Sequence, residues 1–249
     1  MKKVLVFAAV FALLASALSA EVFVTGHAGY SALALDDAKS EYKLGLDYLE
    51  ALFPSSATKN NSEPDGALFA KLDIMVPVLP FVNLGPRLGV ISAMQSRLNY
   101  TYSTNESKST IDAIAVPVML GANISIPLGS DVSLNASAFG GYALGFLTRG
   151  EYSKLLNVVI ADYTANYSSG ALALDFSGGI DIKLANFIKA GINIGYRTCK
   201  FAETKASQEA KYNNVVVVEK DELLEKMGGG ALVIDMSGLD VGLGITIIF

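Results

Sequence analysis

The chain has 249 residues, of which 51% are hydrophobic and only 17% are charged, and its formal net charge is −5 at pH 7. The apolar composition excludes a disordered chain, and the negative charge argues against nucleic-acid binding. A single cysteine (Cys199) excludes an intramolecular disulfide, and a single histidine (His27) excludes a histidine-rich metal site, so we expect no cofactor.

The first twenty residues have the pattern of a secretory signal peptide. Lys2 and Lys3 precede an apolar run over 4–14, and small residues follow up to Ala20. This segment is too short for a membrane-spanning helix, and no later stretch reaches the roughly 18 consecutive apolar residues that such a helix needs. We therefore expect residues 1–20 to be removed on export. Residues 21–249 then form one domain, either a secreted β-domain or a membrane barrel.

Eight segments of the mature chain alternate apolar with small or polar residues, which is the two-residue period of a β-strand. They span 21–31, 67–78, 84–102, 111–126, 132–146, 171–184, 187–199 and 239–249. The face opposite the apolar one is too poor in charge for a solvated exterior and suits a narrow lumen. The pattern therefore predicts an all-β fold, an antiparallel up-and-down transmembrane β-barrel of eight strands whose apolar face contacts outer-membrane lipid.

The charged residues of the lumen face are nearly balanced between basic and acidic. Because charges in a confined interior pair, we expect a lumen charge network that fills the barrel and prevents ion conduction. The expected pairs join Lys71 and Asp73 with Asp181, Lys183 or Arg97. The predicted members are Lys71, Asp73, Arg87, Arg97, Asp175, Asp181, Lys183, Lys189 and Arg197, and the same face carries Asp235 and Asp240.

Connections between the predicted strands alternate between short and long. Short periplasmic turns are expected near residues 79–83, 127–131 and 185–186, and longer external loops at 32–66, 103–110, 147–170 and 201–230. Two apolar runs inside these loops, 155–161 and 215–218, leave open short helices, strand extensions or an extra strand pair. The last of these would give ten strands instead of eight.

The first long loop carries the signals of a short helix. Asp36, Asp37 or Ser40 can cap it, an apolar stripe runs over 42–52, and Pro54 ends it. This helix is either a lid or partner-binding element, or a cap packed over the barrel mouth.

Aromatic residues mark the two expected membrane boundaries. The outer girdle is Tyr30, Tyr100, Tyr102, Tyr142, Phe146 and Tyr196, and the inner girdle is Phe81, Phe187 and Phe249. Nearer the end of the chain, the apolar phase changes around Gly238, which predicts a β-bulge there.

The last strand alternates apolar residues back from Phe249 through Ile247 and Ile245. It looks like the signal that the bacterial barrel-assembly machinery recognises, with Phe249 as the assembly signal. With the export signal and eight strands, the mature chain resembles the small outer-membrane barrels of the OmpA, OmpX and OmpW type. The resemblance implies residence in the outer membrane of a double-membraned bacterium.

Three classes of function fit this barrel. The leading hypothesis is a non-enzymatic surface anchor whose external loops contact a partner or extracellular ligand. The second is a narrow pore or an OmpW-like conduit for small apolar molecules. The third is a barrel enzyme with His27 as general base. No linear motif selects a serine or aspartate to work with His27, so we expect a structural lumen histidine and no enzyme.

Overall fold

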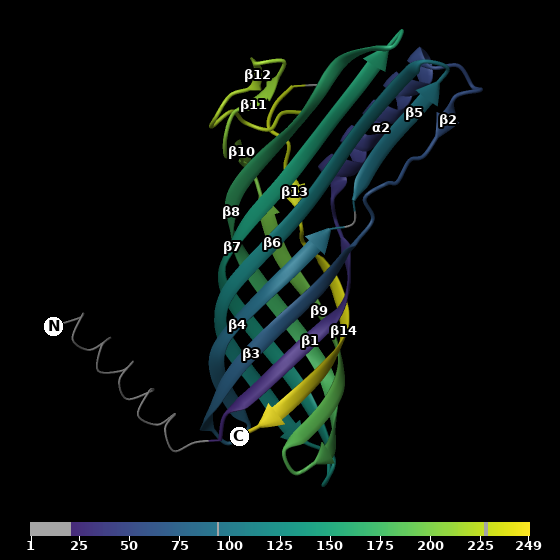
Figure 1. Cartoon of the computed structure of the whole chain (residues 1–249). Helices are drawn as coiled ribbons and strands as arrows, with labels where there is room; N and C mark the ends of the chain where they lie inside the picture. Colours follow the sequence, from purple (N-terminus) through teal and green to yellow (C-terminus); the bar gives the residue numbers. More distant parts are fainter. Residues whose placement is uncertain (1–20, 94, 227–228) are drawn as a thin grey trace, which may run out of the picture.

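The structure is a computed structural model that describes residues 21–93, 95–226 and 229–249 (Figure 1). The expected signal peptide, residues 1–20, lies outside the described residues. Within them, eight antiparallel strands form a closed ring, because β14 pairs with both β9 and β1. In ring order the strands are β1 (Phe23–Leu33), β3 (Ala67–Leu79), β4 (Val82–Ala93), β6 (Asn105–Pro127), β7 (Val132–Leu155), β8 (Val158–Ala185), β9 (Ile188–Phe201) and β14 (Gly238–Ile248).

Ring closure gives every strand two neighbours, which is what a sheet needs inside lipid. The eight-stranded prediction is therefore confirmed, and the ten-stranded alternative is wrong. Short turns connect β3 to β4, β6 to β7 and β8 to β9 at one end, as expected for the periplasmic side. Among the described residues, no helix is long and apolar enough to cross a membrane.

The outer wall of the barrel carries an apolar belt. Its side chains are strongly exposed, for example Leu120 (71%), Leu172 (80%) and Leu243 (66%). On β6 the outward positions change from Ile114 to the polar residues of 105–112, and this change marks the external edge of the belt. So large an exposed apolar surface fits lipid contact and not water. The expectation that the apolar face points outward is confirmed.

Four residues of the predicted outer girdle lie on the outside of the barrel wall: Tyr30, Tyr142, Phe146 and Tyr196. The other two predicted members are wrong. Tyr100 is completely buried and Tyr102 lies at the end of β5 (Ser96–Tyr102), a strand above the belt. The predicted strand 84–102 is thus divided into β4 and β5. The inner girdle residues Phe81, Phe187 and Phe249 are all exposed.

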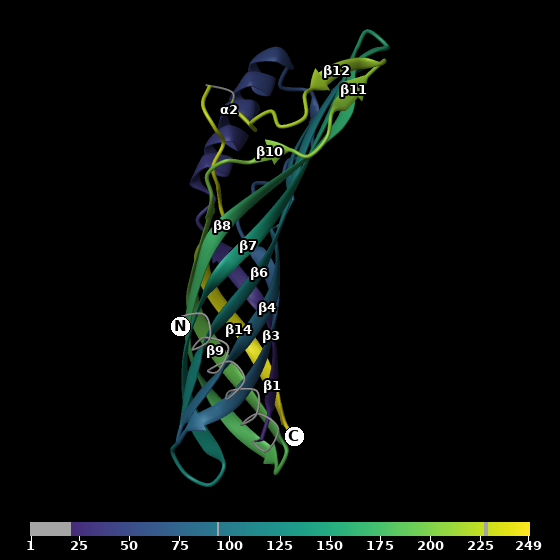
Figure 2. The same ribbon diagram turned by 90° about the vertical axis from the view of Figure 1, so that its left-hand side faces the viewer.

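Three strands continue far beyond the belt (Figure 2). β7 and β8 pair up to Leu155 and Val158, and the turn residues Leu156 and Asn157 both have positive φ, as in a type I′ hairpin. β6 pairs with β5 in the same region. Apart from the turn residues 103–104 and 156–157, the predicted loops 103–110 and 147–170 are therefore strands, and the run 155–161 forms the tip of the extended β7–β8 hairpin.

Short elements complete the external region. β2 (Thr58–Lys59) pairs with β5, and β10 (Lys205–Ala206) pairs with the extended part of β8. β11 (Ala210–Tyr212) and β12 (Val215–Val218) form a separate hairpin, so the apolar run 215–218 belongs to an extra strand pair outside the ring. β13 (Ile234–Asp235) pairs with β9.

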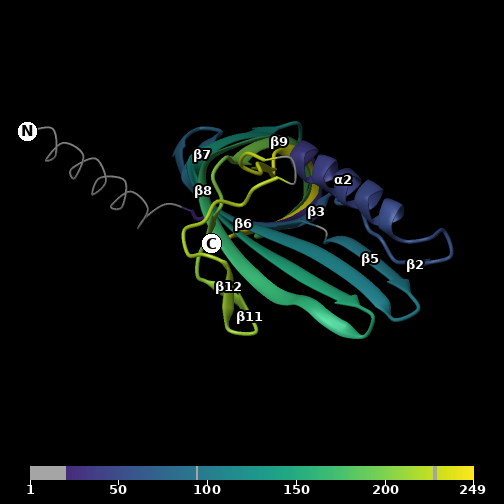
Figure 3. The same ribbon diagram turned by 90° about the horizontal axis from the view of Figure 1, so that it is seen from above.

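The predicted helix is α2 (Asp36–Leu52), but its start differs from the expectation. Leu35 in the left-handed conformation is the N-cap residue, and no side chain caps the helix. Asp36 and Asp37 lie in the first turn, where negative charge is favourable, and Ser40 donates back to the Asp36 carbonyl. Seen from above, α2 starts at the barrel rim and runs outward beside β5 (Figure 3), so it is not a cap over the mouth.

The predicted β-bulge at Gly238 is wrong. The pairing with β9 keeps one register from Ile234↔Phe201 to Gly238↔Arg197. Even-numbered residues point inward on both sides of Gly238, but their character changes from apolar to small or polar. The apolar residues change face at Gly238 because the lumen is apolar before this residue, at Ile234 and Met236, and small or polar after it, as at Asp240.

Candidate functional site

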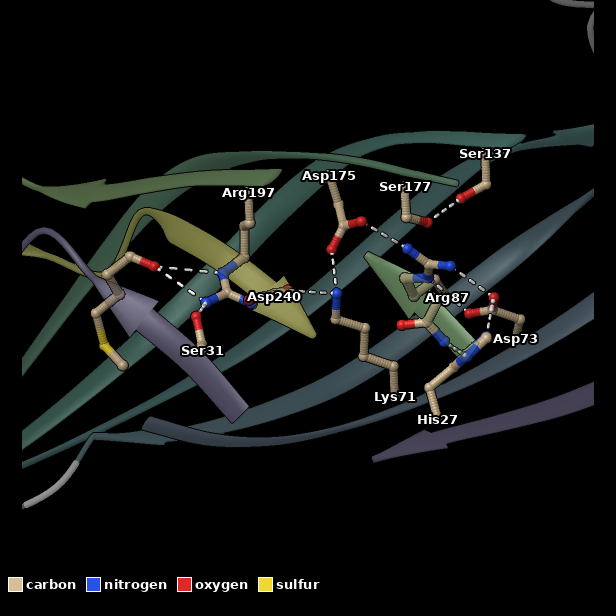
Figure 4. Close-up of polar contacts among 12 residues, drawn as sticks. His27, Ser31, Lys71, Asp73, Arg87, Ser137, Asp175, Ser177, Arg197 and Asp240 are labelled. Atoms are coloured by element: carbon tan, nitrogen blue, oxygen red, sulfur yellow. Dashed lines mark hydrogen bonds and ion pairs between the residues drawn. The ribbon is translucent and has the colours of Figure 1, made fainter. Parts of the chain in front are cut away.

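Three cations and three carboxylates meet inside the barrel and form what we call the ion chain (Figure 4). β3 supplies two of its members, and β4, β8, β9 and β14 supply one each, because the two-residue strand period directs these side chains inward. All six are buried, and their formal charges cancel. The members are Lys71, Asp73, Arg87, Asp175, Arg197 and Asp240.

Arg87 holds the lower part of the ion chain together. Its Nε and Nη2 atoms donate to the two carboxylate oxygens of Asp73, each at 2.7 Å, and Nη1 donates to Asp175 at 2.8 Å. The guanidinium also lies 3.8 Å from the ring centroid of Phe139, a cation–π contact. The bidentate geometry fixes Arg87 across the lumen between β3 and β8.

Lys71 and Arg197 hold the upper part. Lys71 Nζ lies 2.5 Å from Asp175 and 2.7 Å from Asp240, so it bridges β8 and β14. Arg197 donates to Asp240 at 2.8 Å and to Ser31 Oγ at 3.0 Å. Since removing one partner of a buried pair leaves an uncompensated charge, loss of any one member of the ion chain costs about 3–5 kcal/mol. The ion chain is thus a fixed closure across the lumen.

His27 joins the lower end of the ion chain but is not placed as a general base. Its Nε2 lies 3.2 Å from Asp73, and its Nδ1 lies 2.8 Å from the side-chain amide nitrogen of Asn193. Asn193 therefore donates to Nδ1, and Nε2–H donates to Asp73, which uses both ring nitrogens. The nearby hydroxyls of Ser137 and Ser177 bond to each other at 2.6 Å.

Above the ion chain the lumen is filled by what we call the apolar plug. Phe69 illustrates the packing, because a Cβ atom on Gly242 would lie 2.8 Å from its ring and one on Gly29 would lie 2.9 Å away. There is no room for larger inward residues at this level. The buried members of the plug include Leu33, Phe69, Ile91, Leu147, Phe201, Leu232, Ile234 and Met236.

Below the ion chain the lumen is hollow. A cavity of about 340 Å³, which we call the chamber, extends from His27, Asp73 and Arg87 to Phe81 and Pro127 at the periplasmic rim. Asparagine, serine and threonine make up ten of its 23 lining residues. The polar wall residues are Thr25, Asn83, Asn123, Ser125, Ser133, Asn135, Ser137, Ser177, Asn193 and Thr246.

The structure brings together five of the nine predicted network residues: Lys71, Asp73, Arg87, Asp175 and Arg197. The sixth member of the ion chain, Asp240, has the same inward phase as Gly238 and Gly242, and this phase was the only signal for it in the sequence. The expected pairs with Asp181, Lys183 or Arg97 are wrong.

The other four predicted network residues lie elsewhere. Asp181 and Lys189 line the chamber, and Lys183 is exposed near the periplasmic end of β8. Arg97 is exposed on β5, outside the barrel, where it bonds to Gln95. Asp235, which had also been assigned to the lumen face, lies on β13, 3.9 Å from Lys200.

Above the membrane, α2, the extended strands and the β11–β12 hairpin form what we call the platform. A cavity of about 170 Å³ separates α2 from β6 and β7, with Tyr48 and Leu98 among its lining residues. On its floor Arg149 and Ser109 both donate to Glu151 at 2.8 Å. Burial opposes the charge of Arg149, but Glu151 outweighs it and raises the pKa of the guanidinium.

The platform exposes apolar side chains in three places. On α2 they are Leu44, Tyr48 and Leu52, each at least half exposed. The tip of the β7–β8 hairpin adds four aliphatic residues, and β12 adds a run of three valines. These are Leu155, Leu156, Val158, Ile160, Val215, Val216 and Val217.

No family model and no curated protein matches the sequence of the chain. Three solved structures resemble its backbone, each over 92% of this chain. They are the outer membrane protein OprG of Pseudomonas aeruginosa (TM-score 0.42, 11% identity, 96% of that chain), the outer membrane protease OmpT of Escherichia coli (0.44, 9%, 95%) and the attachment invasion locus protein Ail of Yersinia pestis (0.36, 10%, 99%). By its own closed ring of eight strands and its apolar outer belt, the chain is an outer-membrane β-barrel protein.

Proposed function

We propose that the protein is a non-enzymatic, non-conducting outer-membrane anchor that displays its platform to an external partner. One observation carries the proposal: the lumen is closed by the ion chain and the apolar plug, while the strands β6, β7 and β8 continue well beyond the lipid belt.

The closure argues against a central pore. An ion that passed the lumen would have to separate buried pairs such as Lys71–Asp175 and Arg87–Asp73, each held by charge-assisted hydrogen bonds. It would then meet the tightly packed plug around Phe69. Both barriers lie in one narrow barrel, so the structure favours anchoring over transport.

The platform supports the contact with a partner. Contiguous exposed apolar residues on a soluble surface mark interaction sites, since water disfavours them. The platform carries such residues on α2 and on two hairpins, above the membrane belt, where lipid does not cover them.

Conductance tests the proposal. Purified protein in a planar bilayer should give no regular single-channel steps, because the buried ion pairs remain intact. Regular steps of the unmodified protein would refute the anchor and favour the pore.

The assembly machinery remains a proposed partner through Phe249, which is exposed after the end of β14. Deletion of Phe249 should reduce membrane insertion and leave protease-sensitive chain in the periplasm. A Leu128→Ser variant in the β6–β7 turn is the control and should insert normally. Normal insertion of the deletion variant would remove the assembly-signal hypothesis.

A further inference from the structure

We propose that the chamber is a binding site, reached from the periplasm, for a neutral hydroxyl-rich molecule of the size of a mono- or disaccharide. It is independent of the platform and of any external partner. The chamber lies on the opposite side of the ion chain from the plug, and it reaches the periplasmic rim at Phe81 and Pro127.

The wall of the chamber presents hydrogen-bonding groups that are not used by the protein. Asn83 faces Asn123 on the neighbouring strand, and Ser125 faces Asn135 on the next. Within the described residues, the side chains of Asn83, Asn123, Asn135, Ser125 and Ser133 make no hydrogen bond to another protein group. Each amide offers two donors and an acceptor, and each hydroxyl can act in both ways. A ligand with several hydroxyl groups matches this wall.

Charge in the chamber favours a neutral ligand. At its roof, Asp73 and Arg87 already neutralise each other within the ion chain. Lower down, Asp181 and Lys189 contribute one charge of each sign. A charged ligand therefore gains no net attraction, but it loses hydration when it enters.

Size and apolar contacts complete the match. The volume of about 340 Å³ far exceeds the roughly 10–15 Å³ that a single water needs. Phe23 and Phe81 also line the chamber and can pack against the C–H faces of a sugar ring. A polyol that reproduces the hydrogen bonds of the displaced water keeps their enthalpy and releases the water.

Nuclear magnetic resonance of the side-chain amides tests the proposal. Protein in phosphatidylcholine nanodiscs, free of sugar-based detergents, is titrated with D-glucose, trehalose or N,N′-diacetylchitobiose, and with sodium glutamate as a charged probe. Saturable shifts of the Asn83, Asn123 and Asn135 amides are expected for the sugars and not for glutamate. The sugar that binds most tightly identifies the class of natural ligand. Tightest binding of D-glucose or trehalose indicates a free sugar, and tightest binding of N,N′-diacetylchitobiose indicates an amide-bearing glycan.

Three variants sharpen the result. Asn135→Phe should fill the chamber and abolish the shifts of Asn83 and Asn123. The triple variant N83A/N123A/N135A, whose binding is followed at the side-chain amide of Asn193 in the same wall, should weaken binding at least tenfold. Asn60→Ala, an exposed asparagine on the external side, should bind like the unmodified protein. Absence of saturable shifts in the unmodified protein would overturn the proposal even if a variant failed to fold. Equal shifts with glutamate, or unchanged binding by a folded triple variant, would also overturn it.

Discussion

The upper and lower halves of the lumen are lined by the same eight strands, yet one half is packed and the other is hollow. In the upper half the inward residues are large and apolar, such as Phe69 and Phe201, and they stand over glycines that leave them room. In the lower half they are asparagine, serine and threonine around a cavity. Strand alternation thus decides which residues face inward, and side-chain size decides whether the interior is closed.

The ion chain lies at the border between these halves, and its loss should have the largest effect. Arg87→Ser removes three charge-assisted bonds and leaves Asp73 and Asp175 partly uncompensated, so unfolding should become easier by about 3–5 kcal/mol. Arg97→Ser is the matched control, because Arg97 is exposed on β5, and it should change stability by less than about 0.5 kcal/mol.

Thermal unfolding, followed by the gel mobility of boiled and unboiled protein, measures both variants. Arg87→Ser should still give no regular single-channel steps in planar bilayers, because the apolar plug above the ion chain remains packed. Equal stability of the two variants would show that the ion chain does not divide the lumen as described.

A second pair of variants compares the space in the two halves. Gly242→Val in the upper half has no room, since a Cβ atom would lie 2.8 Å from both Phe69 and the Ala28 carbonyl, and overpacking costs about 1–3 kcal/mol. Ser133→Val points into the chamber and should cost less than half as much. Denaturant midpoints measured in the same lipid test the difference, and the reverse order would contradict it.

The sequence was sufficient for the strands and for the direction of their faces, because a two-residue period is visible in every strand of the ring. It could not predict the ion pairs. Asp175 and Asp181 have the same inward phase on β8, but the stagger of the closed barrel places Asp175, and not Asp181, level with Lys71. Stagger depends on all strands together and leaves no local signal.

The external extensions were missed for another reason. Beyond the belt, the outward face of β8 is polar, as at Asp162 and Thr164, and the inward face carries Tyr163 and Tyr167. The apolar phase is therefore the reverse of the phase that marks a membrane strand. The I′ turn at Leu156–Asn157 has an unusual leucine at positive φ in place of the usual glycine-containing pair. Arg97 was assigned to the lumen because the end of β4 at Ala93 is not visible in the alternation.

The smallest expected effect on stability comes from the contact between α2 of the platform and the plug. Asp37 on α2 accepts hydrogen bonds from Lys226 Nζ, at 2.8 Å, and from the main-chain nitrogen of Val233, which lies between the plug residues Leu232 and Ile234. The hydrogen bond from Lys226 holds the pKa of Asp37 below its usual value near 3.8. The lowered pKa means that these hydrogen bonds favour the ionised carboxylate, so ionised Asp37 stabilises the folded protein.

The stabilisation by Asp37 is therefore complete at neutral pH and is lost as the pH falls below 3.8 and through the lowered pKa. The Val233 amide resonance should move with this titration in the unmodified protein and should not move in Asp37→Asn. In Asp36→Asn it should move as in the unmodified protein, because the bonds to Lys226 and Val233 come from Asp37. A Val233 resonance that titrates equally in Asp37→Asn would show that another group holds the plug segment to α2.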